Sequence, residues 1–310
     1  MGNQVRTALL LGTMTVFILL IGQMLGGRQG MVLALILAGV MNFGSYWFSD
    51  KIVLRMYRAK EVTPQQAPDL YDMVRTLSQN AGIPMPKVYI IPQDSPNAFA
   101  TGRNPEHAVV AVTEGLLRIM DRDEVMGVLA HELAHVKNRD ILIGSIAATM
   151  AGAVMVLASM ARWSAIFGGG HGGNDRGGLG TIGLIITSIL APIGAMIIQM
   201  AISRSREYLA DSTGARFAQS SNGLARALEK LGAYSRKVPM QDSPSTAHMF
   251  IVNPLSGAGL MNLFSTHPPL EQRIARLRGQ APRGGTPGPE EDRRMAAGKA
   301  FWDSMSGPKR

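Results

Sequence analysis

Four long stretches without a charged residue dominate the pattern of hydrophobic and polar positions along the chain. They cover residues 7–27, 31–48, 141–161 and 177–203, which are 21, 18, 21 and 27 residues long. About 20 apolar helical residues cross the roughly 30 Å hydrocarbon core of a bilayer. The first stretch is too long for the hydrophobic part of a signal peptide, and the second follows it at once. The pattern therefore predicts four transmembrane helices rather than buried core helices.

The positive charges next to these stretches predict the orientation. Nine Lys or Arg residues lie on one side of the predicted membrane: Arg6, Lys51, Arg55, Arg58, Lys60, Lys137, Arg139, Arg204 and Arg206. Three lie on the other side: Arg28, Arg162 and Arg176. Positive residues concentrate on the cytoplasmic side, so we expect both termini in the cytoplasm. Much of the net charge of +9 is thereby explained without a nucleic-acid partner.

The segments between the predicted helices give the domain organisation. Residues 1–48 form two N-terminal transmembrane helices, and residues 141–203 form a second membrane hairpin with a Gly-rich loop. Residues 49–140 and 204–280 form two cytoplasmic pieces, together large enough for one hydrophobic core. Residues 281–310 are rich in Pro, Gly and charge, which predicts a disordered tail. The sequence therefore predicts an α-rich integral membrane protein with a cytoplasmic domain.

A His-Glu-x-x-His motif lies in the first cytoplasmic piece. His131, Glu132 and His135 fall within residues 123–138, where the apolar residues have helical spacing. Residues i and i+4 share one helix face, so both imidazoles can bind one ion with the glutamate beside them. The chain has no cysteine, which excludes disulfides, thiolate zinc sites and a cysteine nucleophile. The motif is typical of a zinc site that activates water.

A catalytic zinc site needs a third protein ligand, and Glu207 is the best candidate. Asp211 follows one helical turn later, where it can accept the free ring N–H of a ligand histidine and fix its orientation. Alone, this spacing fits an ordinary pair of solvated acids. Together with the paired histidines, it predicts a site of His131, His135 and Glu207 with Asp211 behind it.

On these motifs the sequence resembles the HtpX-type membrane zinc metalloproteases, which are related to the CAAX prenyl proteases. The resemblance also rests on the segment 97–102 (Asn-Ala-Phe-Ala-Thr-Gly), on His267-Pro268-Pro269 before Arg273, and on the order of the predicted spans. It extends from the first span to about residue 280. It implies a zincin-like (gluzincin) α+β catalytic domain with a small β-sheet and one Zn²⁺ per subunit.

The resemblance also implies how the remaining site residues act. Substrate would pair with an exposed edge strand at Asn97, Ala98, Phe99, Ala100 and Thr101, while His267 and Asn97 stabilise the oxyanion. Glu132 would be the general base in peptide hydrolysis. The implied function is proteolytic quality control of misfolded or damaged membrane proteins, in a stress context, at the cytoplasmic face of the bacterial inner membrane. The partners are then the lipid bilayer and unfolded or membrane-protein substrates.

Other readings of the same residues are a CAAX-type prenyl protease, a transporter and a non-catalytic metal-binding scaffold. Four spans are few for the first, which encloses a large chamber. The predicted spans contain no Asp, Glu, Lys, Arg or His, the residues that usually mark a transport pathway. The intact Glu132 argues against a scaffold. Read alone, His267 fits a loop residue, and Arg273 either pairs with a site carboxylate or lies on the surface. The sequence leaves substrate preference and oligomeric state open.

Overall fold

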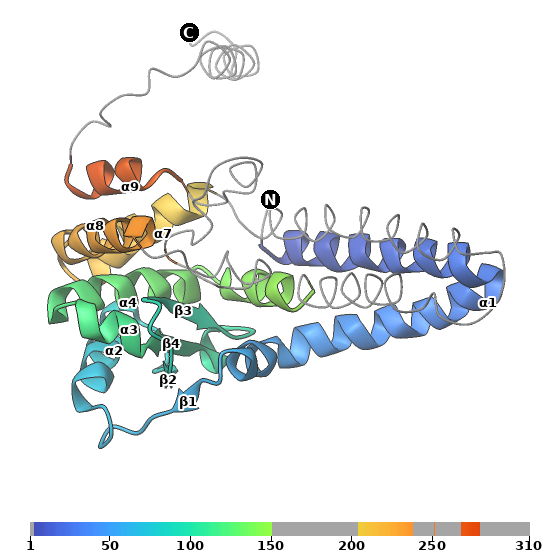
Figure 1. Ribbon diagram of the computed structural model, residues 1–310, viewed down its shortest axis with the longest axis horizontal. Helices are drawn as coiled ribbons and strands as arrows, with labels where there is room; N and C mark the ends of the chain where they lie inside the picture. Colours follow the sequence, from blue (N-terminus) through green and yellow to red (C-terminus); the bar gives the residue numbers. More distant parts are fainter. Residues whose placement is uncertain (1–2, 151–203, 238–250, 252–267, 280–310) are drawn as a thin grey trace, which may run out of the picture.

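A computed structural model gives the structure of the protein for residues 3–150, 204–237, 251 and 268–279 (Figure 1). The predicted span 177–203, most of the predicted span 141–161 and the predicted tail lie outside these residues. So does His267.

The first helix, α1 (Asn3–Met56), is bent into two antiparallel arms (Figure 1). The bend falls at Gly27, whose φ of 55° is a left-handed conformation that glycine adopts without strain. The arms are joined by a hydrogen bond of 2.8 Å from Asn42 Nδ2 to Thr15 Oγ1. The two arms lie where two N-terminal transmembrane helices are predicted, and the second arm continues eight residues beyond the apolar stretch that ends at residue 48. That both arms cross a membrane stays a prediction.

Much of the surface of α1 is apolar and exposed. Large exposed apolar side chains lie on both arms. Val16 and Leu20 are on the first arm, and the second arm carries Leu33, Ile36, Leu37, Val40, Phe43 and Trp47. Within the described residues, one segment, Gly27–Met56, is long and apolar enough to cross a membrane. Thr7–Leu20 and Ile141–Met150 are shorter apolar helices. The described part of the chain thus contains one clear candidate span, and the predicted number of four is not established.

A four-stranded sheet follows α1, with the strand order β1-β2-β4-β3. The strands are β1 (Lys60–Glu61), β2 (Lys87–Ile91), β3 (Ala98–Thr101) and β4 (Val109–Thr113). Strand β4 is parallel to β2 and antiparallel to β3. The expected small β-sheet is present, and the expected edge strand at residues 97–101 corresponds to β3. A short helix, η1 (Pro105–His107), lies between β3 and β4.

Helices cover one face of this sheet, and α4 (Arg122–Lys137) lies nearest to it (Figure 1). On its other sides α4 packs against α7 (Arg204–Phe217) and α8 (Asn222–Lys237). Helix α9 (Leu270–Leu277) packs against α8. Helix α2 (Pro68–Ala81) also contacts α4, and α3 (Glu114–Ile119) continues from β4. Residues far apart in the sequence therefore meet around the central helix α4.

Candidate metal centre

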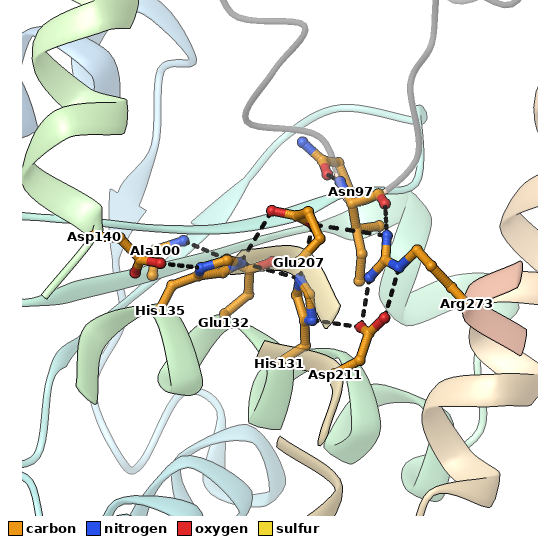
Figure 2. Close-up of polar contacts among 10 residues, drawn as sticks. Asn97, Ala100, His131, Glu132, His135, Asp140, Glu207, Asp211 and Arg273 are labelled. Carbon is orange, nitrogen blue, oxygen red and sulfur yellow. Dashed lines mark hydrogen bonds and ion pairs between the residues drawn. The ribbon is translucent and has the colours of Figure 1, made fainter. Parts of the chain in front are cut away.

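Helix α4 presents the His-Glu-x-x-His motif as predicted. Asp121 caps its start in a capping box with Glu124, so the helix begins one residue before the predicted position. The rings of His131 and His135 lie on one face, with their Nε2 atoms 3.2 Å apart (Figure 2). His131 and Glu132 are buried, and the His135 side chain is 18% exposed.

Glu207 completes the cluster from α7. Its two carboxylate oxygens lie 3.7 Å from His131 Nε2 and 3.6 Å from His135 Nε2. Zinc bonds of about 2.0–2.1 Å in a tetrahedral site place neighbouring ligand atoms about 3.4 Å apart. Each histidine is nearest to a different oxygen of Glu207, and one donor atom from each of the three residues lies within 4.8 Å of the others. This spacing is close to that of a Zn²⁺ site, and the nitrogen and oxygen donors suit the ion.

A carboxylate lies behind each histidine. Asp211 Oδ1 lies 2.9 Å from His131 Nδ1, which is the arrangement expected from its spacing after Glu207. Asp140 Oδ2 lies 3.1 Å from His135 Nδ1, and the sequence reasoning missed this contact. After α4 ends, Arg139 adopts a left-handed conformation with φ of 58°. The turn brings the carboxylate of Asp140 back toward His135. Both imidazoles are thus held with Nε2 directed to the shared centre.

Arg273 is a buried part of the site rather than a surface residue of α9. It is 1% exposed, and its guanidinium donates two hydrogen bonds, of 2.9 and 2.7 Å, to the two oxygens of Asp211 (Figure 2). A third N–H donates to the carbonyl oxygen of Ile251 at 2.8 Å. Burial favours the neutral form of Asp211, but Arg273 outweighs it and lowers the pKa of Asp211 to about 2. The carboxylate therefore stays charged behind His131.

The pKa values of Glu132 and His135 are both raised strongly above their usual range. Burial raises the pKa of Glu132 to about 7, which lies close to the value that suits a general base at neutral pH. Burial opposes protonation of His135, but the carboxylates of Asp140, Glu207 and Glu132 outweigh it and raise its pKa to about 10. A metal ion that binds His135 must therefore displace a proton.

The predicted substrate strand lies beside the base. β3 is an edge strand whose pairing partner is β4 on one side, and the backbone N–H of Ala100 donates to Glu132 Oε2 at 3.0 Å. The expectation of exposed residues is wrong, because all four residues of β3 are buried. Asn97 is also buried, and its Oδ1 accepts a 3.4 Å hydrogen bond from the Ile251 N–H. Whether Asn97 contacts an oxyanion stays a prediction.

Comparison with known proteins decides the family. Residues 64–281 match peptidase family M48. The chain belongs to this family. It is 67% identical over 309 residues to the "Protease HtpX homolog" of Desulfatibacillum aliphaticivorans, covering 98% of this chain and all of that one. The "Protease HtpX homolog" of Desulforapulum autotrophicum is 69% identical over 278 residues, which is 90% of each chain. The resemblance to HtpX-type metalloproteases is confirmed.

The family membership makes this chain a protease of a metallopeptidase family. Among solved structures, Ste24p of S. mikatae is similar with a TM-score of 0.49 and 17% identity. The alignment covers 89% of this chain and 64% of Ste24p, so this chain spans less than two thirds of that protein.

Proposed function

We propose that this M48 peptidase is a zinc-dependent endopeptidase that cleaves misfolded or damaged membrane proteins at the cytoplasmic face of the membrane. The observation that carries the proposal is the convergence of His131, His135 and Glu207 beside a buried Glu132. When bound by these three side chains, a zinc ion supplies Lewis-acid polarisation of a scissile carbonyl and makes water more acidic.

Glu132 moves the proton in this reaction. Its carboxylate takes a proton from the attacking water and delivers it to the amine of the departing peptide. A pKa near 7 allows both transfers at neutral pH. The Ala100 N–H holds one carboxylate oxygen at 3.0 Å, which orients Glu132 toward the centre. Asp211 and Asp140 hold the two histidines, and Arg273 keeps Asp211 charged.

The substrate binds as an extended segment along the edge of β3 that lies opposite β4. The strand lies at the sheet edge, and the N–H of Ala100 points away from β4 toward Glu132. A peptide that adds to this edge forms main-chain hydrogen bonds, which read few side chains and allow broad sequence tolerance. Asn97, which directly precedes this strand, and His267 stabilise the developing oxyanion.

The exposed apolar surface of α1 supports insertion in a bilayer. α1 ends at Met56, four residues before the sheet begins, so the site is held close to the membrane surface. The positive residues that flank the predicted spans support a multi-pass protein with the catalytic domain and both termini in the cytoplasm. Cytoplasmic loops of membrane proteins and unfolded segments near the bilayer are the substrates within reach.

The test compares the wild type with Glu132→Gln, using full-length protein in detergent with stoichiometric zinc and unfolded casein as substrate. We expect both to bind zinc and only the wild type to cleave. Glu106→Gln, which changes an exposed glutamate on η1, is the matched control and should cleave normally. Equal cleavage by wild type and Glu132→Gln would contradict the role of the base. Cleavage confined to a prenylated peptide would favour the CAAX-type alternative.

A further inference from the structure

The two faces of the edge strand β3 pack into two different hydrophobic clusters. Ala98 and Ala100 lie in the main hydrophobic core with residues of α4. Phe99 lies in a second cluster with Val53, Leu54 and Tyr57, at and just after the end of α1, and with Ala148 of the helix Ile141–Met150. The Phe99 and Tyr57 rings are 5.4 Å apart. The strand is therefore packed between the active-site helix and two apolar helices.

A buried hydrogen-bonded chain ties the end of the same face to the helix Ile141–Met150. Thr101 Oγ1 and Ser145 Oγ are 2.6 Å apart, and neither residue is accessible to solvent. Ser145 Oγ donates its hydrogen to the Ile141 carbonyl oxygen at 2.8 Å. Because a hydroxyl has one hydrogen to donate, Thr101 must be the donor to Ser145. The bond therefore runs from the strand to the helix.

A third contact follows the strand. The guanidinium of Arg103 lies over the ring of Trp47 in α1, 4.9 Å from its centroid. Gly102 makes this turn possible, because its φ of 133° and its close approach to the His107 carbonyl exclude a side chain. Phe99, Thr101 and Arg103 thus alternate along the chain, and each binds an apolar helix or the segment that directly follows one.

We propose that Phe99, Thr101 and Arg103 are positioning residues, through which the apolar helices hold β3 in the place where it receives substrate. This inference rests on the proposed function. The Ala100 N–H contacts Glu132, so a displacement of β3 alters both the pairing edge and the orientation of the base. Cleavage of a soluble peptide then depends on the packing of the apolar helices, although the peptide never enters the bilayer.

The decisive variant is Thr101→Val, which keeps the shape of the side chain and leaves Ser145 its bond to Ile141. We expect kcat/KM for casein to fall about five- to tenfold, since small misplacements of positioning groups have large effects on rate. Zinc affinity and melting temperature should stay near the wild-type values. Hydrogen exchange at the Ala100 amide should become faster, and Thr101→Ser should restore both exchange and rate.

The matched control is Thr149→Val, which removes a hydroxyl from the same helix. Thr149 Oγ1 donates to the Ser145 carbonyl oxygen of its own helix at 3.0 Å and does not reach β3. This variant should cleave at the wild-type rate. Wild-type rate and exchange in Thr101→Val would overturn the inference, as would equal losses in Thr101→Val and Thr149→Val. If the zinc-loaded wild type cleaves nothing, the proposed function fails instead, and the exchange measurement still decides whether Thr101 holds the strand.

Discussion

Gly214 sets how closely the helix of the third ligand approaches the helix of the two histidines. Glu207, Asp211 and Gly214 follow one another at i, i+4 and i+7 on α7, so they share the face that meets α4. A Cβ on Gly214 would lie 2.8 Å from the backbone nitrogen of His131 and 2.9 Å from the carbonyl carbon and oxygen of Ala130. These atoms belong to the backbone of α4, so no flexible side chain can move aside to make room.

We predict that Gly214→Ala weakens zinc binding. Non-bonded atoms prefer a separation of about 3.5 Å, so α7 must retreat by about 0.6 Å. A zinc site tolerates changes of about 0.2 Å in its bond lengths, so Glu207 no longer meets the histidines well. We expect the zinc Kd to rise about 10- to 100-fold, equivalent to about 1.4–2.7 kcal/mol. The apo protein should lose about 1–3 kcal/mol of stability through overpacking.

The measurement is zinc competition against a chelating dye, with thermal unfolding of the apo protein alongside. Gly223→Ala is the matched control, because a Cβ there would clash with the Asp123 carbonyl oxygen and displace α8, which carries no ligand. It should lower the melting temperature without changing zinc affinity. Gly144→Ala meets no atom within 4 Å and should change neither. If Gly214→Ala loses stability as Gly223→Ala does but binds zinc like the wild type, the reasoning is refuted.

Three further predictions concern the buried charges. Arg273→Met leaves Asp211 buried without its cation and should destabilise the protein by about 3–5 kcal/mol in chemical unfolding, whereas a surface pair would give less than about 1 kcal/mol. Asp140→Asn should raise the zinc Kd about 10- to 100-fold in the same dye competition, and an unchanged Kd would show that Asp140 does not hold His135. Zinc affinity should increase with pH between 6 and 9, by about tenfold per pH unit for each proton that the metal displaces. The reason is that His135, with a pKa of about 10, carries a proton over this range when no metal is bound. A zinc affinity that does not change with pH would contradict this protonation state.

The sequence by itself determined the features that depend on local spacing. Residues four apart share a helix face whatever the surroundings, so local spacing is sufficient to place His131 beside His135 on one helix and Glu207 beside Asp211 on another. The apolar stretch at 31–48 likewise identified the long arm of α1, because bilayer thickness fixes the length of such a helix.

Only the tertiary structure decided which side chains come into contact when their residues are far apart in the sequence. Arg273 reaches Asp211 over 62 residues, and no periodicity connects them, because the contact depends on how α9 packs beside α7. Asp140 reaches His135 through a left-handed turn at Arg139. Arginine rarely adopts this conformation, so the residue type does not predict the turn. The edge strand β3 was predicted as exposed and is buried. The active-site helix α4 covers one face of β3, and the end of α1 and the helix Ile141–Met150 cover the other. The sequence pattern of the strand alone does not indicate which helices pack against it.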